Sequence, residues 1–541
     1  MERQVYEMPD NLIQTRESNR SGPIAVSRRA LLGMGLGAAM LPVLEACSSS
    51  GGSSSAPSGS GQSNSASGTL AWAWGLPMNW DPVTDSAGLD TVNQALVYDS
   101  LTSVDASGNA KGWLAETWSA KADGTQFTFK LRPNLKFSDG SPLDATAVAK
   151  SINRGRTAKN SVLLEKLASI KDVTAQGATD VVVTMTAPNY QCPLLLSGQT
   201  GMIINPAAFA TDAAAASLAT QPAGSGPFAL TSYTPNASAQ FTRNPNFYLA
   251  DQIKVANLVL YPQPDPTVVA AATSSGQYNI SLIPPSGIDG AKAAGLDVQV
   301  IPSPIVYALA FNTSIAPFNN PAVIEAIQYG IDRDKIVAVG QFGVGKASTQ
   351  PFPPGQPGYN SSVASMYAYD PAKAKQILAK AGLSGGVHGT FTAVAPVSNY
   401  PHVELIQGQL AEVGINLNIE PLPPAQFNAV AQAGRGRGMI FTAITNRASP
   451  VQTLLVLSGK TGLLNVSGLQ DPKVDSLLTR ISGTPLEDPS YPSLLQQANE
   501  LIVTGFPYAF LCTSPFALAR QSSVQELSWS EFSYGFEGIS V

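Results

Sequence analysis

The sequence predicts an α/β protein with more than one domain. Its 541 residues exceed the size of an ordinary single domain, and roughly two to four domains are expected for this length. Within residues 391–420, two strand patterns flank a helical pattern: Phe391–Ala395, Val403–Val413 and Ile415–Glu420. A β-α-β unit of this kind forms parallel strands joined by a right-handed crossover, so this part of the chain is expected to be α/β.

A second indication of an α/β fold is the strand and helix predicted between residues 307 and 331. Ala308–Phe311 is apolar enough for a strand buried on both faces. Asn320 suits the N-cap of the following helix, and Pro321 suits its first position, where a missing N–H costs nothing. The inner face of this helix is formed by apolar residues spaced four apart: Val323, Ile327 and Ile331.

Composition restricts the class of function. With 44% hydrophobic and 13% charged residues, the chain has the composition of a globular protein. A net charge of -5 provides no basic surface for nucleic acid. Three cysteines and two histidines leave little material for metal chemistry, since a closed zinc site alone needs four such ligands. We therefore expect no metal, no cofactor and no nucleic-acid partner.

Residues 1–47 resemble an export signal. Arg28 and Arg29 precede an apolar run that ends at Leu44 and is too short to span a bilayer comfortably. The long polar stretch before these arginines resembles a twin-arginine signal. The ending Leu-Glu-Ala-Cys resembles a bacterial lipobox, which implies cleavage before Cys47 and acylation of that residue. A plain signal peptide with a chance cysteine is the alternative.

Residues 48–68 are predicted to form a linker. Their serines and glycines favour a flexible chain, and Ser48–Ser67 would have an r.m.s. reach of about 25 Å. With a lipid on Cys47, this linker would tether the folded part to the outer face of the cytoplasmic membrane, in the cell envelope or periplasmic space.

The globular pattern begins near Gly68. Trp72 and Trp74 lie two apart in a short apolar segment and would face the same side of a strand. Farther along, Phe127, Phe129 and Leu131 alternate with polar residues, which predicts a strand with one exposed face. Asp144 can cap the helix that follows.

Several segments resemble the signature of a known family in both order and spacing. They read LAETW at 114–118, DGTQFTFKLR at 123–132, GSGPF at 224–228 and RNPNFY at 243–248, and they are followed by FNT, PF and IDR between 311 and 333. On these segments the chain resembles the family 5 extracellular solute-binding proteins, the dipeptide, oligopeptide and nickel receptors of ABC importers.

The resemblance implies a particular fold. This fold is a periplasmic-binding-protein-like, two-lobed clamp of type II, cluster C, with an inserted third domain. Lobe I would combine residues 69–112, 222–310 and 505–541; the inserted domain would cover 113–221 and lobe II 311–504.

The resemblance also implies a function. The protein would deliver a small polar solute to an ABC importer by closing its cleft, and the solute would be peptide-like, or anionic or neutral. The expected partners are the solute, the permease subunits and, through the lipid, the membrane; a monomer is expected.

No nucleophile or acid pair with an orienting base is visible, so the protein is not expected to be an enzyme. A surface lipoprotein with hydrolase or chaperone activity, or a receptor used only for signalling, remains an alternative.

The resemblance and loop positions together give candidate ligand contacts. Peptide receptors of this family hold the ligand's amino terminus with an aspartate in a segment that follows a strand like Met439–Ile444. Here Asn446 and Arg447 stand in that segment, and Arg447 would repel an ammonium. An anionic or neutral polar ligand is therefore favoured, unless Arg447 is simply an exposed loop residue. The full set of candidates is Trp74, Asn312, Tyr400, Phe441, Asn446 and Arg447.

Two cysteines remain in the mature chain once Cys47 is acylated. Cys192 and Cys512 could form a disulfide in an exported protein, and the implied fold would place both in or near lobe I.

Overall fold

The computed structural model describes the folded part of the chain: residues 66–86, 90–262, 265–394, 400–423, 426–427, 436–528, 535 and 539–540. The predicted export signal, Cys47 and most of the predicted linker lie outside the described residues. None of the helices in the described residues combines the length and apolar character that a bilayer span requires.

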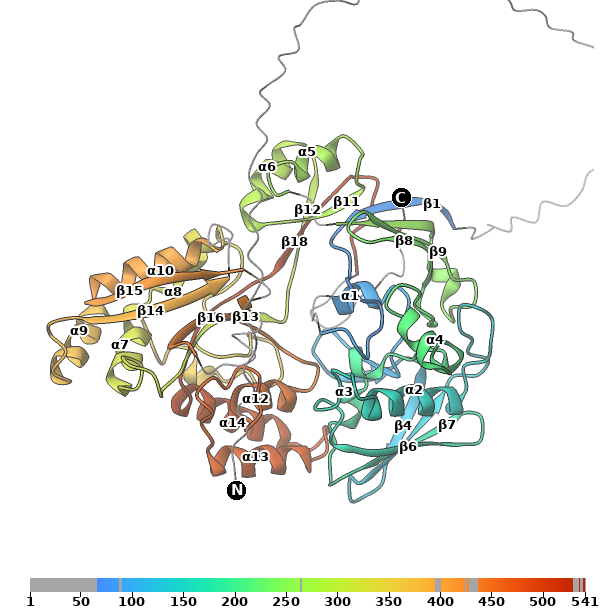
Figure 1. Ribbon diagram of the computed structural model, residues 1–541, viewed down its shortest axis with the longest axis horizontal. Helices are drawn as coiled ribbons and strands as arrows, with labels where there is room; N and C mark the ends of the chain where they lie inside the picture. The colour runs from blue at the N-terminus through green and yellow to red at the C-terminus, as the bar shows by residue number, and fades with distance from the viewer. Residues whose placement is uncertain are drawn as a thin grey trace, which may run out of the picture. The chain divides into compact units, whose positions relative to one another are not determined.

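A seven-stranded sheet forms the first lobe (Figure 1). Its order is β12 (Asp297–Ile301), β18 (Phe516–Arg520), β11 (Ile280–Ile283), β1 (Ser67–Ala73), β10 (Val255–Tyr261), β9 (Ser238–Arg243) and β8 (Phe228–Thr234). The strand β1 lies inside the sheet, because it pairs in parallel with β10 on one side and with β11 on the other. Two short helices, α5 (Val269–Ser274) and α6 (Ile288–Ala293), pack against β18 in a small hydrophobic cluster.

A five-stranded sheet forms the second lobe. Its order is β15 (Ile415–Leu422), β14 (Val387–Val394), β16 (Met439–Thr445), β13 (Ile305–Phe311) and β17 (Tyr508–Thr513). The strands β14 and β15 are parallel and are joined through α10 (Pro401–Glu412), which packs on β15. The predicted β-α-β unit is therefore confirmed.

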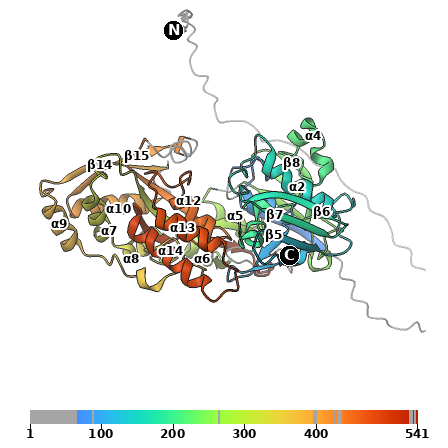
Figure 2. The same cartoon turned by 90° about the horizontal axis from the view of Figure 1, so that it is seen from below.

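Helices cover both faces of this second sheet. On β13, Leu309 and Phe311 contribute to one hydrophobic cluster, whereas Ala308 and Ala310 contribute to another. This alternation follows from the two-residue period of a strand, and it produces three layers. One outer layer contains α7 (Pro321–Gly330), α9 (Pro371–Lys380) and α10; the other contains α12 (Pro450–Ser458), α13 (Pro472–Ser482) and α14 (Tyr491–Gly505). The last three helices pack on one another, as Figure 2 shows.

Local capping chemistry places several of these helices. The side chain of Asn320 accepts a hydrogen bond from the backbone N–H of Ala322, and Pro321 follows as the first helical residue of α7. Asp332 caps the short α8 (Arg333–Lys335) by accepting from the N–H of Lys335. The cap at Asn320 was expected from the sequence, and the structure confirms it.

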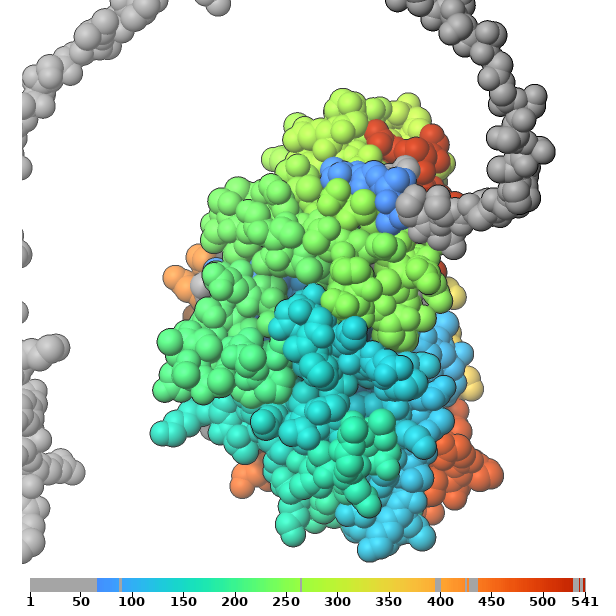
Figure 3. Space-filling view, turned by 90° about the vertical axis from the view of Figure 1, so that its right-hand side faces the viewer, coloured from blue at the N-terminus to red at the C-terminus, as the bar shows by residue number. Residues whose placement is uncertain are grey.

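A third sheet lies in the predicted inserted segment. It has the order β4 (Ala115–Ala120), β5 (Gln126–Leu131), β7 (Asp180–Met185) and β6 (Ile170–Gln176), and it is covered by α2 (Ala145–Thr157). Asp144 caps α2 by accepting from the N–H of Ala147. The seven-stranded and four-stranded sheets share one hydrophobic cluster, and the surfaces of the two regions are continuous in Figure 3.

Small elements complete the region around this shared cluster. They are α1 (Asp90–Gln94), the hairpin of β2 (Thr102–Val104) and β3 (Ala110–Gly112), α3 (Cys192–Leu195) and α4 (Asp212–Ser217).

The strand pairing moves two of the predicted lobe boundaries. Residues 305–310 and 505–513 were assigned to lobe I, but β13 and β17 pair with each other inside the five-stranded sheet. The chain therefore crosses between the two large sheets at residues 302–304 and 514–515. An apolar strand that is buried on both faces carries no pattern that tells which of two sheets it enters.

The predicted disulfide is wrong. Cys192 and Cys512 are both free, and each is buried in a different hydrophobic cluster: Cys192 in the one shared by the seven-stranded and four-stranded sheets, and Cys512 in one of the second lobe. Cys512 lies on β17 and thus in lobe II. Burial raises the pKa of Cys192 well above its ordinary value and that of Cys512 to about 12, so both thiols stay protonated.

Candidate functional site

A cavity of about 960 Å³ lies between the second lobe and a wall formed jointly by the first lobe and the inserted segment. Residues 98–103, 162–166 and 194–202 provide lining on one side. Residues 443–448 and 452–464 provide lining on the other side, from the end of β16 through α12 to the loop after it. A cavity shared by two lobes is a usual place for a small-molecule site.

Hydrogen bonds join the two walls beside this cavity. The Thr461 hydroxyl donates to Glu165 Oε1 at 2.7 Å, and the Gln452 side chain donates to the backbone oxygen of Lys166 at 3.0 Å. The segment 165–166 is therefore held against both ends of the α12 region. These bonds describe a closed arrangement of the two walls.

A second group of contacts between the same lobes is fully buried. Gln191 Oε1 accepts hydrogen bonds from the Ser449 hydroxyl and from the Tyr491 hydroxyl, both at 3.1 Å. The backbone N–H of Tyr190 donates to the backbone oxygen of Ser482 at 2.7 Å. Residues 190–191 thus dock on the amino-terminal ends of α12 and α14.

Arg447 enters the cavity from the second lobe. Its position follows from the end of β16: the N–H of Asn446 donates to the oxygen of Pro304, and the N–H of Arg447 donates to the Thr453 hydroxyl at 2.8 Å. Burial lowers the pKa of Arg447, although the nearby charge of Glu165 opposes this effect. Among the described residues, no carboxylate lies within 4 Å of the Arg447 guanidinium.

Lys166 enters the same cavity from the inserted segment. Its ammonium donates to Gln199 Oε1 at 2.7 Å. Burial and the positive charge of Arg447 lower the pKa of Lys166 to about 8, and the charge of Asp85 acts in the opposite direction. Two cations from different lobes therefore interact unfavourably across the cavity.

The acidic residues that line the cavity are mostly committed to other partners. Asp99 Oδ1 accepts from the Trp113 indole at 2.9 Å, and Asp99 Oδ2 accepts from the Ser225 hydroxyl at 3.3 Å. Glu165 accepts the hydroxyl of Thr461. The third acid, Asp475, is exposed on the first turn of α13.

The orientation of Lys166 depends on a buried ion pair farther away. Arg154 on α2 makes a bidentate contact with Asp81, whose side chain is buried, at 2.8 and 2.5 Å. This pair anchors the loop in which Pro82 and Asp85 accept hydrogen bonds from the Gln199 side chain through their backbone oxygens. Gln199 is thereby placed to receive the Lys166 ammonium.

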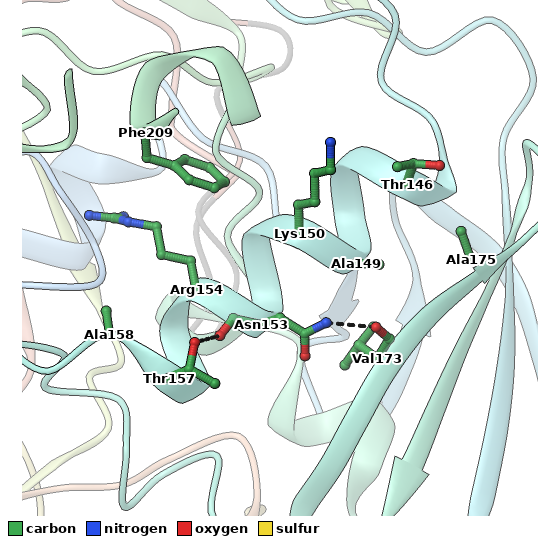
Figure 4. A pocket seen from close by; sticks show the side chains of 10 residues that line it. All are labelled: Thr146, Ala149, Lys150, Asn153, Arg154, Thr157, Ala158, Val173, Ala175 and Phe209. Carbon is green, nitrogen blue, oxygen red and sulfur yellow. Dashed lines mark hydrogen bonds between the residues drawn. The ribbon is translucent and has the colours of Figure 1, made fainter. Parts of the chain in front are cut away.

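A second pocket of about 540 Å³ lies against α2 (Figure 4). Lys150, Arg154 and Phe209 line it, and the Arg154 guanidinium lies 5.3 Å from the centre of the Phe209 ring. Asn153 donates to the oxygen of Val173 at 2.7 Å and fixes α2 on the sheet. Since Arg154 is already paired with Asp81, this pocket offers less free charge than the cavity between the lobes.

The structure brings only two of the six predicted ligand contacts to the cavity, Asn446 and Arg447. Trp74 is buried in the first core, with its ring 5.7 Å from that of Trp72 and 5.3 Å from that of Phe516. Asn312 is also buried, and its side-chain oxygen accepts from both the N–H and the hydroxyl of Ser314. Neither residue lines the cavity.

The other two predicted contacts, Tyr400 and Phe441, belong to an aromatic cluster inside the second lobe. Phe441 is buried, and its ring lies 4.8 Å from that of His402 and 5.2 Å from that of Tyr307. Tyr400 packs at the edge of the same cluster, 5.7 Å from Phe441. Burial lowers the pKa of His402 to about 4, so this histidine is neutral at physiological pH.

Sequence reasoning did not find Lys166, Glu165 or Gln199. They come from the inserted segment, and no local motif marks them as facing a residue near 447.

The described residues also contain no group of three or more histidine, cysteine, aspartate or glutamate side chains able to hold a metal ion.

Two large sheets joined by two crossings, with a charged cavity between the lobes, define a two-lobed solute-binding protein. Residues 109–463 match the family of bacterial extracellular solute-binding proteins, family 5 Middle. The chain therefore belongs to this family.

Known relatives agree with this assignment. The chain is 26% identical over 430 residues to the glutathione-binding protein GsiB of Escherichia coli (strain K12). The aligned region covers 76% of this chain and 83% of that protein. It is 25% identical over 522 residues to di/tripeptide-binding protein 3 of Pseudomonas aeruginosa (strain UCBPP-PA14), with 88% and 95% covered.

Solved structures share the fold. The periplasmic binding protein DppA from Helicobacter pylori, in complex with the peptide STSA, superposes with a TM-score of 0.77 at 22% identity and covers 88% of this chain and 98% of its own. AgaA from A. tumefaciens R10, in complex with agropinic acid, gives a TM-score of 0.74 at 22% identity, with 88% and 99% covered.

Proposed function

We propose that this protein is the receptor of an ABC importer for a small solute that carries a negative charge. The solute would bind in the cavity between the second lobe and the wall formed by the first lobe and the inserted segment. Its acidic group would lie between Arg447 and Lys166 and would accept charge-assisted hydrogen bonds from both.

One observation carries this proposal: two partly buried cations, one from the inserted segment and one from the second lobe, line one cavity, and Arg447 has no carboxylate within 4 Å among the described residues. A buried charge without a partner is costly, and an anionic ligand would remove this cost. A ligand with an ammonium group in the same place would increase it.

The same charges suggest how binding would close the cleft. Without a ligand, the repulsion between Arg447 and Lys166 favours separation of the walls. An anion between them replaces repulsion by two attractions, so it binds the closed form more tightly than the open form and shifts the population toward closure. The hydrogen bonds from Thr461 to Glu165 and from Gln452 to Lys166 then hold the closed form.

The names of the relatives support a solute receptor but leave the ligand open. They include receptors for glutathione, for di- and tripeptides and for nickel, and one structural neighbour holds agropinic acid. The positive charge of Arg447 favours an acidic ligand among these classes of solute.

The test is a thermal-shift screen of the purified full chain against organic acids, peptides and sugars. A ligand that binds only the folded protein raises the melting temperature. We expect stabilisation by acids, and its loss in the Arg447→Gln variant. Stabilisation by cationic peptides alone would show that the anion site is wrong.

We also propose that the mature protein is monomeric and is held at the membrane by acyl groups on Cys47. Cys47 follows a segment that resembles a lipobox, and each methylene of a buried acyl chain adds about 0.8 kcal/mol to membrane affinity. Mass spectrometry of the membrane-extracted protein would detect the acylated amino terminus. The Cys47→Ala variant should leave the membrane fraction; unchanged retention would contradict the lipid anchor.

A further inference from the structure

We infer that the solute is amphipathic: an organic acid whose hydrocarbon part lies along α12, beyond the cation pair. This inference rests on the proposed receptor function and specifies its class of substrate. It depends on the order of polar and apolar side chains along the cavity.

The first step is the apolar lining of the second lobe. Leu455 and Leu463 are 43% and 45% exposed, and both line the cavity. Large apolar side chains with such exposure are unfavourable in water, and when they gather in a hollow they mark a binding surface. Val456 and Leu464 line the cavity next to them.

The second step is the arrangement of α12. Its residues Val451, Leu454 and Leu457 are buried in the core of the second lobe. The opposite face presents Gln452, Leu455 and Val456 to the cavity, at positions i, i+3 and i+4. A surface face of a helix usually carries polar residues at such positions. Here only Gln452 is polar, and it is bonded to the backbone of Lys166.

The third step is the order along the helix. Arg447 lies just before α12, and its backbone N–H donates to Thr453; the backbone oxygen of Lys166 accepts from Gln452, and the Lys166 ammonium interacts with the charge of Arg447, so both cations lie toward the amino-terminal end of α12. Leu455 and Val456 lie one turn farther along, which is about 5 Å at 1.5 Å per residue. Leu463 follows after the helix ends. Lys460 and Thr461 line the cavity between the end of the helix and Leu463, so Leu455 and Val456 are the apolar side chains that follow the cation pair along the chain.

The fourth step is the opposite wall. The inserted segment lines the cavity with Val162, Leu194, Leu195 and Met202. The hydrocarbon part of a ligand would thus be covered from both sides. A short polar anion would leave this apolar lining without a contact. An acid with an unbranched or branched alkyl group fits this arrangement; a small, fully polar anion does not.

The experiment is calorimetric titration of the full chain with butyrate, hexanoate and octanoate, and with octan-1-ol and octylamine as probes without a negative charge. We expect affinity to rise about fourfold for each added methylene, because burying one methylene contributes about 0.8 kcal/mol. The alcohol should bind far more weakly than octanoate, and the amine should not bind.

Variants separate the two halves of the site. Leu455→Gln and Leu463→Gln should reduce the dependence of affinity on the length of the acid's alkyl chain. The matched control is Leu469→Gln, because Leu469 is 38% exposed but does not line the cavity. Melting temperatures of the three variants check that each is folded.

Different results would overturn different statements. If the acids bind but affinity does not depend on chain length, or if Leu455→Gln and Leu469→Gln behave alike, the inference is wrong and the anion site stands. If no acid binds, or if octan-1-ol binds as tightly as octanoate, the anion site itself is wrong and the inference falls with it.

Discussion

The Lys166 ammonium and the Arg447 guanidinium line one cavity from two different lobes, and the charge of Arg447 helps to lower the pKa of Lys166 to about 8. The relationship is unusual for a folded protein, because like charges are normally kept apart or separated by a carboxylate. An anion placed between them turns this unfavourable contact into a binding site.

The first prediction concerns Arg447. Replacing Arg447 with Gln should weaken the binding of an acidic ligand by roughly 10- to 100-fold, since a hydrogen bond to a charged group contributes about 1.5–3 kcal/mol. Titration calorimetry measures this change. Lys473→Gln is the control, because Lys473 is an exposed cation on α13 that does not line the cavity. Equal effects of both variants would indicate a general effect of net charge instead of a site.

The second prediction concerns pH. Lys166 has a pKa of about 8 in the free protein, and a bound anion would raise it because the anion favours the charged form. Affinity for the anion should therefore be nearly constant below pH 8. It should fall as pH rises above 8, because binding then requires Lys166 to take up a proton, and this costs free energy. Titrations at pH 8.5 in buffers of different ionisation enthalpy should show uptake of protons. Lys166→Met should abolish both effects, and persistence of either would assign them to another group.

The third prediction concerns the pair of Asp81 and Arg154. Asp81→Asn leaves the Arg154 guanidinium buried without its counter-charge, which should cost about 3–5 kcal/mol of unfolding free energy. Urea unfolding measures this loss. Asp172→Asn, at an exposed position, is the control. In addition, ligand affinity should fall in Asp81→Asn, because the loop that holds Gln199 loses its anchor; unchanged stability would show that the pair is not needed.

The fourth prediction concerns His402. Its pKa is about 4 in the folded protein, below the ordinary value of 6.5. The unfolded chain therefore binds more protons than the folded protein between these pH values. The free energy of unfolding should be retained above pH 6.5 and should fall by about 2–3 kcal/mol as pH decreases toward 4. His402→Gln should remove this part of the acid sensitivity, whereas His388→Gln, at an exposed position, should not. Identical pH profiles for both variants would contradict the assignment.

Much of the fold could be predicted from local patterns. Asn320 and Asp144 each act as the expected cap, and the β-α-β unit around α10 has the expected parallel strands. These features depend on neighbouring residues only, so the sequence contains what is needed to find them. The lobe boundaries at β13 and β17 depend on pairing between strands about 200 residues apart, which no local pattern reveals.

The candidate site was predicted only in part, for the same reason. Arg447 could be found because it follows a strand whose end faces the cleft in proteins of this kind. Lys166 could not, because its role depends on a contact with a residue some 280 positions away. Trp74 and Phe441 show the opposite error: an aromatic residue on a strand has the same pattern whether it contacts a ligand or fills a core, and both are buried.

The position of β1 has a mechanical consequence. This first strand of the described chain starts at Ser67, immediately after the serine- and glycine-rich segment, and lies between β10 and β11 instead of at an edge of its sheet. Any pull transmitted through the preceding segment would act on an interior strand and load its ladder of backbone hydrogen bonds with β10. An attachment through this segment would thus act at a place that resists peeling, while the two crossings between the large sheets would stay free of that load.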